Sequence, residues 1–372
     1  MTSQPVLRIV LLDSIPTWGG GEAWCVRTTA ALERRGHRVV IACDRGSALE
    51  ERARDQGLEV WAEHLTGPRA LLAARRLARR MREDGTEILI ANLNRDVRMG
   101  ASACSRSGAR LVQRRGIARR IKPTRRSRAL YTGPVRHVIV NCQAILDEMT
   151  AGADWLDRSR FTVVPNGIEV GAEPTSAERE EARVRLEIAS DRPCACIVAR
   201  LAPMKGHAYL LAAWPTVLER VPGALLLVAG AGESATELRA SALRQDLGES
   251  VRFLGFLADP RPVLVASDLF VLASVRDEGC NNTLLEAMEC GLPAVVTRCG
   301  GLVEQVLAGE TGRIVPIGDG PALGSAIAEL LGDPALRGRM ARAARQRALS
   351  NYALPAVTER LEQLLLSIRA GP

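Results

Sequence analysis

Aromatic residues and histidines are scarce in this sequence, and its cysteines form no recognisable pattern. Only 3% of the 372 residues are aromatic, so the hydrophobic cores must consist mainly of leucine, valine, isoleucine and alanine. The four histidines are not spaced like metal ligands, and the nine cysteines include no C-x-x-C pair. We therefore expect reduced and mostly buried cysteines, without a disulfide framework or a zinc site. We also expect no other metal ion and no resident cofactor.

Long apolar runs are missing as well. No stretch approaches the roughly 20 consecutive apolar residues that span a bilayer. The apolar run near the start is short enough to be a first β-strand, which argues against a signal peptide. The sequence thus predicts a cytoplasmic protein that can still bind the inner face of a membrane as a peripheral protein.

Acidic residues are absent from one long interval. No aspartate or glutamate lies between Asp96 and Asp147, although the formal charge of the whole chain is only +8. The basic residues of this interval are Arg98, Arg106, Arg110, Arg114, Arg115, Arg119, Arg120, Lys122, Arg125, Arg126, Arg128 and Arg136. Such a block is either a solvated face or the binding surface for an anionic lipid or a phosphorylated acceptor. A nucleic acid is disfavoured, because single-strand binders interleave aromatic residues with basic ones and Tyr131 is the only aromatic residue from 98 to 136.

Short apolar runs alternate with amphipathic segments along the whole chain. The expected strands are 6–12, 38–43, 87–92, 109–113, 137–141, 194–199, 224–230, 250–255, 268–273 and 293–297. The expected helices are 22–35, 70–83, 206–220, 233–246, 281–290 and 320–331. Repeated strand–helix units favour parallel sheets, and the turn-rich stretch 163–180 separates two such series. We therefore expect an α/β protein with two doubly wound, Rossmann-like domains that face each other across a cleft.

Glycines and cations follow several of the expected strands. "WGGGE" (18–22) and "AGAGE" (229–233) bring backbone close to a neighbour or a ligand, and either motif alone is also compatible with a plain tight turn. "ARLAPMKGH" (199–207) places Arg200 and Lys205 around a short loop before a helix. Because ligands of doubly wound sheets bind at the carboxyl ends of the strands, these residues are candidates for a diphosphate site.

"EGCNNTLLEA" (278–287) follows another expected strand and carries two glutamates. Glu278 lies at the tip of a loop, and Asn281 or Asn282 can cap the helix that follows. We expect the amides of 279–281 to point at an anion. Glu286 lies about 80° further around the helix and two turns on, so the two carboxylates suit opposite ends of one long ligand. A nucleoside diphosphate joined to a sugar has hydroxyls at both ends and phosphates between them.

In this order, the motifs resemble those of the retaining glycosyltransferases of family 4, which have the GT-B fold. The matching stretches are "GGGE" (19–22), "VVPNGIE" (163–169), R-x4-KG (200–206), GxG (230–232), E-x7-E (278–286) and the glycine pair 300–301. "QRRG" (113–116) is similar to a segment of the transferases that build bacterial lipopolysaccharide and other surface glycans. The resemblance covers nearly the whole chain.

This resemblance implies the transfer of a sugar, with retention of configuration, from a nucleotide-sugar to a glycan or a lipid-linked acceptor, with UDP as the first choice of nucleotide. It implies an acceptor-side domain (1–167), a donor-binding domain (168–350) and a C-terminal helix (351–372) that packs back on the first domain. The residues expected to bind the donor are Gly20, Gly21, Arg200, Lys205, Gly230, Gly279, Cys280, Asn281, Asn282 and Glu286. The residues expected to act in catalysis are Glu278, Lys205, Arg200 and Asp96.

One departure from the family and two alternative functions bear on this reading. Many members carry a histidine in the first domain, whereas "ANLNRDVRMG" (91–100) offers Asn94 and Asp96, of which Asp96 is the expected substitute. A nucleotide-sugar 2-epimerase shares the fold, but it needs histidines, which are rare here. The remaining alternative is a non-catalytic protein that binds anions or nucleic acid.

Overall fold

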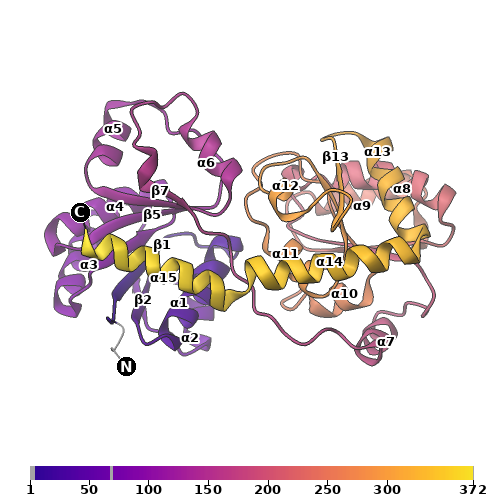
Figure 1. The fold of residues 1–372 in the computed structure, drawn as a ribbon, viewed down its shortest axis with the longest axis horizontal. Helices are drawn as coiled ribbons and strands as arrows, with labels where there is room; N and C mark the ends of the chain where they lie inside the picture. The colour runs from indigo at the N-terminus through magenta and orange to yellow at the C-terminus, as the bar shows by residue number, and fades with distance from the viewer. Residues whose placement is uncertain (1–4, 68–69, 372) are drawn as a thin grey trace. The chain divides into compact units, whose positions relative to one another are not determined.

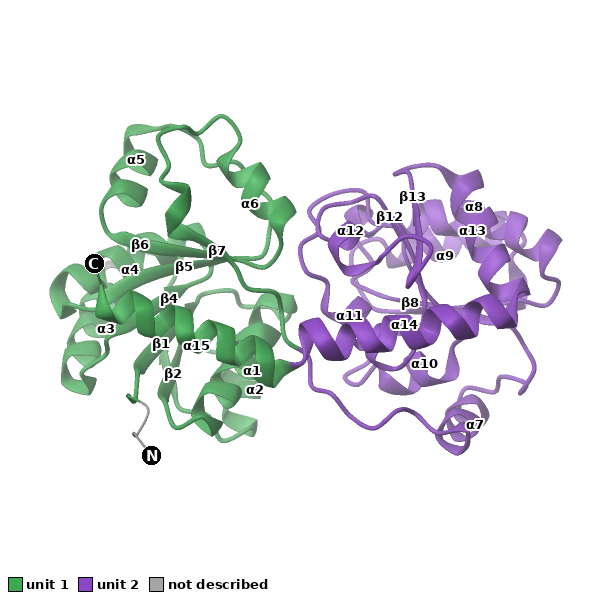
Figure 2. Cartoon of the chain, in the orientation of Figure 1, with its two compact units in different colours: residues 1–167, 354–372 green, residues 168–353 purple. Residues whose placement is uncertain are grey.

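The structure is a computed structural model, and it describes residues 5–67 and 70–371. Internal contacts divide the chain into two compact units (Figures 1 and 2). Unit 1 comprises Met1–Gly167 and Leu354–Pro372, and unit 2 comprises Ile168–Ala353. The chain therefore enters unit 2 once, leaves it once, and ends in unit 1.

Within its described residues, unit 1 contains a parallel sheet of seven strands in the order β3-β2-β1-β4-β5-β6-β7. These strands are β1 (Arg8–Asp13), β2 (Arg38–Asp44), β3 (Val60–Glu63), β4 (Ile88–Ala91), β5 (Arg110–Arg115), β6 (Val135–Val140) and β7 (Phe161–Val163). Its helices are α1 (Gly20–Arg34), α2 (Ala48–Asp55), α3 (Ala70–Asp84), α4 (Asn94–Ser107), α5 (Arg125–Thr132), α6 (Gln143–Thr150) and α15 (Leu354–Ala370), with the 3₁₀ turn η2 (Arg158–Arg160). One hydrophobic core unites the sheet with α3, α4 and α6, and another unites it with α1, α2 and α15.

Unit 2 repeats this topology in its described residues, with six parallel strands in the order β10-β9-β8-β11-β12-β13. The strands are β8 (Cys194–Val198), β9 (Leu225–Ala229), β10 (Val251–Gly255), β11 (Leu269–Leu272), β12 (Ala294–Thr297) and β13 (Gly312–Val315). The helices are α7 (Ser176–Arg185), α8 (His207–Arg220), α9 (Ala235–Arg244), α10 (Arg261–Ala266), α11 (Asn282–Glu289), α12 (Leu302–Gln305), α13 (Gly320–Gly332) and α14 (Pro334–Tyr352), with the 3₁₀ turns η3 (Pro203–Lys205) and η4 (Gly248–Ser250).

In each sheet, successive strands are added first on one side of the unit's first strand and then on its other side. The point where the strand order reverses positions the functional residues. In unit 1 the reversal lies between β1 and β4, and in unit 2 it lies between β8 and β11. The connections leave such neighbouring strands toward opposite faces, and ligands of doubly wound sheets bind at the carboxyl ends of these strands. The prediction of two doubly wound, Rossmann-like domains is confirmed.

The strands that the sequence pattern missed lie at sheet edges. The strands β3 and β7 border the first sheet, and β13 borders the second. Each has only three or four residues, and at least half of its side chains are only partly buried. The central strand β8, in contrast, is buried at every position. A strand appears in the sequence as a continuous apolar run where both faces of the sheet are covered. These short, partly exposed edge strands contain no such run, so the sequence pattern did not predict them.

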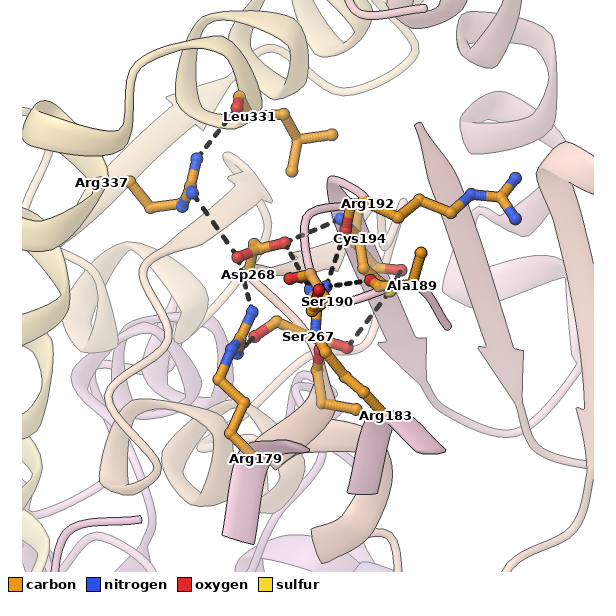
Figure 3. A network of polar contacts seen from close by, with 12 residues as sticks. Arg179, Arg183, Ala189, Ser190, Arg192, Cys194, Ser267, Asp268, Leu331 and Arg337 are labelled. Atoms are coloured by element: carbon orange, nitrogen blue, oxygen red, sulfur yellow. Dashed lines mark hydrogen bonds and ion pairs between the residues drawn. The ribbon is translucent and has the colours of Figure 1, made fainter. Parts of the chain in front are cut away.

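A cluster of arginines around Asp268 anchors helices to the sheet of unit 2 (Figure 3). The Asp268 carboxylate accepts from Arg179 at 2.7 Å, from Arg183 at 3.0 Å and from the backbone amide of Cys194 at 2.8 Å. Arg337 of α14 lies 3.5 Å from the same carboxylate. The cluster thus ties α7 and α14 to the amino-terminal ends of β8 and β11, at the edge opposite their carboxyl ends.

The last helix, α15, is part of the core of unit 1. Glu362 on this helix is fully buried, and its carboxylate contacts the guanidinium of Arg35 and the ring of His37, the latter at 2.7 Å. A buried carboxylate without partners destabilises the fold, so these contacts favour a single position of α15 on unit 1. Among the described helices, none combines the length and the apolar character that crossing a membrane requires.

Candidate active site

Lys205 and Glu278 meet at the point in unit 2 where the strand order reverses. Lys205 ends η3, which follows β8, and Glu278 lies in the loop that follows β11. The Lys205 Nζ atom donates to Glu278 Oε1 at 2.5 Å. The side chain of Lys205 is 18% exposed and that of Glu278 is 4% exposed. The sequence assigned these two residues to one site, and the structure brings them into direct contact.

Neighbouring groups hold the carboxylate of Glu278 in one orientation. Ser274 Oγ donates to Oε1 at 2.5 Å, and Asn281 Nδ2 donates to Oε2 at 3.4 Å. The carbonyl oxygen of Glu278 accepts from the amide of Gly301 at 3.2 Å. Because both its side chain and its backbone are bonded, Glu278 is preorganised for contact with a ligand.

The backbone around Glu278 adopts conformations that most residues avoid. Asp277 has φ of 60° without being a glycine. Gly300 has φ of 48°, and a Cβ atom at this position would lie 2.0 Å from the carbonyl oxygen of Glu278. The first residue of the glycine pair 300–301 thus lets the loop after β12 pack directly against Glu278. Left-handed non-glycine residues are uncommon and often lie at functional sites.

Helix α11 starts where the sequence predicted it. However, one backbone amide that we expected to face a ligand already donates a hydrogen bond within the protein. Asn281 is the N-cap, and its Oδ1 accepts from the amide of Leu284 at 2.9 Å. We expected the amides of 279–281 to point at an anion. This expectation is wrong for Asn281, because its amide donates to Gln305 Oε1 at 2.8 Å. Gln305 was missed, since an amide side chain four residues after a glycine pair carries no sequence signal for such a contact.

The other predicted donor-site residues lie around the same strand ends. Arg200 follows β8 and is exposed, with its guanidinium 3.6 Å from the sulfur of Met204. Cys280 is buried, whereas Asn282, the first residue of α11, and Glu286, on its second turn, are partly exposed. Gly279 lies in the loop between Glu278 and α11.

Gly230, which was assigned to the ligand, and its neighbour Gly232 have a packing role in the structure. A Cβ atom on Gly230 would lie 1.9 Å from the carbonyl oxygen of Ala199, and one on Gly232 would lie 2.4 Å from that of Leu201. The loop after β9 therefore touches the backbone on both sides of Arg200. Close packing accounts for Gly230 without a ligand contact, and it also fixes the loop that carries Arg200.

A buried histidine lies beside the Lys205 ammonium. His207 is the first residue of α8 and is 3% exposed, and neither ring nitrogen has a partner within the described part of the chain. Burial lowers the pKa of His207 to about 4, and the charge of Lys205 adds to this effect. The imidazole is therefore neutral at physiological pH.

Unit 1 has its own polar cluster where its strand order reverses. Asp13 ends β1 and is fully buried, and its Oδ2 accepts from the Nδ2 atom of Asn92, which follows β4, at 2.7 Å. A Cβ atom on Gly21 would lie 3.8 Å from the same oxygen and 4.0 Å from the guanidinium of Arg114. The predicted glycine turn, in which Gly20 starts α1, thus covers a buried acid, an amide and an arginine.

The ionisable groups of this cluster influence each other. Burial and, to a lesser degree, the neighbouring carboxylate of Asp13 together raise the pKa of the Glu22 carboxyl to about 7. The guanidinium of Arg114 stacks on the ring of Trp24 at 4.6 Å and donates to Asn166 Oδ1 at 2.9 Å. Neither Asp13 nor Glu22 was predicted, because single acids next to a strand end or a glycine turn are common.

Asp96 lies inside unit 1 and supports a loop. It is fully buried, and its carboxylate accepts from the hydroxyl and the amide of Ser14 and from the amide of Leu93. Burial raises the pKa of Asp96 to about 6, although the hydrogen bond from Ser14 opposes this shift. In this structure the side chain is thus not accessible to a sugar, and its visible role is to hold the loop after β1.

The basic interval divides into an inner and an outer part. Arg114 and Arg115 are buried, and Arg115 donates to the carbonyl oxygen of Arg119 at 2.9 Å. The exposed basic residues are Arg98, Arg106, Arg119, Arg120, Lys122, Arg125, Arg126, Arg128 and Arg136, and we call this set the arginine surface. Only part of the block is therefore available to a partner. In the described residues, no three His, Cys, Asp or Glu side chains form a group that could hold a metal ion.

Comparisons with known proteins give the family of the chain. The family "Glycosyltransferase Family 4" matches residues 18–171, and the family "Glycosyl transferases group 1" matches residues 178–347. The sequence is 35% identical over 187 residues to the lipopolysaccharide core biosynthesis glycosyltransferase LpsE of Rhizobium meliloti, with 50% of this chain and 53% of that protein covered. It is 33% identical over 213 residues to a GDP-mannose-dependent phosphatidylinositol monomannoside mannosyltransferase of Mycolicibacterium smegmatis, with 54% and 55% covered. The matched regions span only about half the length of these curated relatives.

Solved structures give the fold. A glycosyltransferase from Rickettsia africae superposes with a TM-score of 0.88 at 17% identity, covering 99% of this chain and 100% of the other. Anabaena Alr3699/HepE in complex with UDP and glucose superposes with a TM-score of 0.85 at 22% identity, covering 97% and 100%. The two family matches lie on the two halves of this fold, and the motifs of the E-x7-E region lie in the second. The chain therefore belongs to glycosyltransferase family 4 and has the GT-B fold.

Proposed function

We propose that this chain is a retaining glycosyltransferase that uses a nucleoside diphosphate sugar as donor and a glycan or a lipid-linked molecule of the bacterial surface as acceptor. The contact between Lys205 and Glu278 carries this proposal. It places a cation, which suits a diphosphate, next to a preorganised carboxylate, which suits the hydroxyls of a sugar. The ligand that combines both chemistries in adjacent positions is a sugar diphosphate.

In this proposal, different residues of unit 2 bind different parts of the donor. Lys205 and Arg200 bind the diphosphate and stabilise the negative charge that develops on it as the bond to the sugar breaks. Glu278 binds hydroxyls of the donor sugar, and Glu286, eight positions further on, binds the ribose. Since Lys205 and Arg200 are fixed cations, we propose that the reaction needs no divalent metal.

Unit 1 supplies the acceptor side in this proposal. The buried group of Asp13, Asn92 and Arg114 lies under Gly21 at the carboxyl ends of the strands. Because Asp13 and Arg114 are themselves buried, they support this turn from below, and the exposed Gly20 and the partly exposed Gly21 are the groups that an acceptor can reach. The observed contacts of Asp96 support a positioning role through Ser14 rather than a direct part in the chemistry.

The arginine surface supports a location at the inner face of the membrane. Its residues are exposed, and the described acidic residues nearby engage few of them, as in the 3.5 Å contact of Arg120 with Glu148. Basic residues close to a membrane bind anionic lipids with about 1 kcal/mol each. A peripheral enzyme held in this way meets lipid-linked acceptors without a membrane-spanning helix.

The test is a panel of UDP-, GDP- and ADP-sugars incubated with lipid-linked and free glycan acceptors, with products identified by mass spectrometry. Both UDP and GDP belong in the panel, because one similar structure contains UDP and one relative depends on GDP-mannose. The anomeric configuration of the product, read by NMR, tests retention. Epimerisation of a donor sugar without transfer to any acceptor contradicts the proposal.

A further inference from the structure

Gln305 pairs with both backbone groups of a single residue. It ends α12 and is 1% exposed. The amide of Asn281 donates to Gln305 Oε1 at 2.8 Å, and Gln305 Nε2 donates to the carbonyl oxygen of Asn281 at 2.9 Å. A carboxamide offers one acceptor and two donors, so it can replace the hydrogen bonds of a neighbouring strand. A glutamate would lose the donor, and a leucine would lose both bonds.

Asn281 connects this pairing to the candidate active site. Its Nδ2 donates to Glu278 Oε2 at 3.4 Å, while its Oδ1 caps α11 through the amide of Leu284. The single hydroxyl hydrogen of Thr283 is shared by two acceptors, because Thr283 Oγ1 lies 2.9 Å from this Oδ1 and 2.9 Å from the carbonyl oxygen of Val198, the last residue of β8. The position of the Asn281 peptide thus determines both where α11 begins and where one oxygen of Glu278 is held.

Gln305 is itself held from the other side. Arg347 of α14 donates to the carbonyl oxygens of Gln305 at 2.8 Å and Glu304 at 2.6 Å. Tyr352, the last residue of α14, donates from its hydroxyl to Glu304 at 3.3 Å. The hydrogen bonds from Arg347 and Tyr352 hold the short helix α12 in place. The side-chain amide of Gln305 therefore has a fixed position beside Asn281.

We propose that Gln305 is a positioning residue, which orients the Glu278 carboxylate by holding the peptide of Asn281. Its importance for sugar transfer rests on the proposed function, but the positioning itself does not. The role requires both hydrogen bonds, because the amide and the carbonyl of Asn281 belong to two consecutive peptide groups and each bond fixes only one of them. The hydrogen bonds of the Gln305 side chain go to the backbone of Asn281 and not to the Glu278 side chain, so Gln305 acts on Glu278 through Asn281.

Two variants and a matched control test this inference. Gln305→Leu removes both bonds, and Gln305→Glu keeps the size of the side chain and the acceptor but removes the donor. The control is Gln346→Leu on the exposed face of α14, where the glutamine bonds only Ser350 among the contacts seen. Three quantities are measured: kcat and KM with UDP-glucose and GDP-mannose, the affinity for UDP and GDP by calorimetry, and amide hydrogen exchange over 279–284.

We expect kcat to fall about 10²-fold in Gln305→Leu, because a displacement of about 1 Å has that effect on a catalytic group. We expect nucleotide affinity to change less than about threefold, since the displaced group contacts the sugar and not the nucleotide. Exchange of the amides of residues 281–284 should accelerate about tenfold or more in both Gln305 variants, through local opening of this turn. The control should change none of these quantities.

Folded variants with wild-type kcat, or with unchanged exchange over 281–284, overturn the proposal. A loss of nucleotide affinity as large as the loss of kcat overturns it too, because that pattern indicates general damage to the unit. If Gln305→Leu does not fold, Gln305→Glu decides. If the wild-type protein transfers no sugar from either donor, the proposed function fails, while the exchange measurement still supports or refutes the positioning of Asn281.

Discussion

Lys205 and Glu278 are 73 positions apart in the sequence, and their side chains form a hydrogen-bonded ion pair of 2.5 Å. Each follows one of the two adjacent strands, β8 and β11, between which the sheet order reverses. The pair is largely shielded from water, so its charges act on a ligand in a medium of low dielectric constant.

Glu278→Gln should lower kcat about 10²-fold while the protein stays folded, because a carboxylate contact with a sugar hydroxyl strengthens in the transition state. Glutamine keeps the shape of the side chain but not its charge. Turnover is measured with the donor that the panel identifies, and circular dichroism confirms the fold. Glu181→Gln on the exposed face of α7 is the control. Wild-type turnover in a folded Glu278→Gln protein rules out the assigned role.

Lys205→Met should reduce kcat/KM by about 10²- to 10³-fold, the usual effect of removing one group that stabilises developing negative charge. Methionine keeps the length of the aliphatic chain and removes the ammonium. In a parallel experiment, the wild-type protein should retain its activity after exhaustive treatment with EDTA. Activity that disappears with EDTA and returns only with Mg²⁺ or Mn²⁺ shows that the fixed cations do not suffice.

Glu22 should make the stability of the protein depend on pH. The folded-state pKa is about 7 and lies above the ordinary value of 4.5, so the folded protein binds this proton more tightly than the unfolded chain. Its contribution is complete below about pH 4.5 and is lost as the pH rises toward 7, at up to about 1.4 kcal/mol per pKa unit.

The measurement compares thermal unfolding of the wild type and Glu22→Gln from pH 5 to pH 8. Glutamine cannot ionise, so the variant should gain stability relative to the wild type as the pH rises. The exposed Glu181→Gln variant should follow the wild type across the range. A difference between Glu22→Gln and the wild type that is constant with pH contradicts the raised pKa.

Asp268→Asn should destabilise unit 2 by about 3 kcal/mol, because it leaves the buried Arg183 and the partly buried Arg179 and Arg337 without their counter-charge. Arg183, which is 2% exposed, depends most on this aspartate. Denaturant unfolding measures the change, and Asp147→Asn, which breaks an exposed contact with Arg158 at 3.2 Å, should cost less than about 1 kcal/mol. Equal effects of the two substitutions would show that the cluster is not a structural anchor.

The arginine surface should bind vesicles that contain anionic lipid, and high salt should weaken this binding. Replacing Arg119, Arg120, Arg125 and Arg126 with glutamine should reduce sedimentation with such vesicles. The control replaces an equal number of exposed arginines in unit 2, namely Arg185, Arg244, Arg339 and Arg342. Equal binding to neutral and anionic vesicles, or an equal loss in both variants, refutes the role of this surface.

The sequence by itself determined the architecture and the family. Apolar strands such as β8 and β11 are buried on both faces, so they appear as continuous hydrophobic runs that any reader of the sequence can find. The motifs around Arg200, Lys205 and Glu278 follow such runs directly, and strand ends of a parallel sheet meet at one edge. Local patterns therefore sufficed for the fold and for grouping these residues.

Only the tertiary structure decided which side chains touch. It paired Lys205 with Glu278, assigned Gly230 to packing against Ala199, and placed Asp96 inside unit 1. It also supplied Gln305, whose contact with Asn281 bridges 24 positions. Such contacts depend on the register of strands and on the exact course of loops, and these are set by packing across the whole unit. A sequence pattern records the period of local structure, but it carries no information on distances between loops that are remote along the chain.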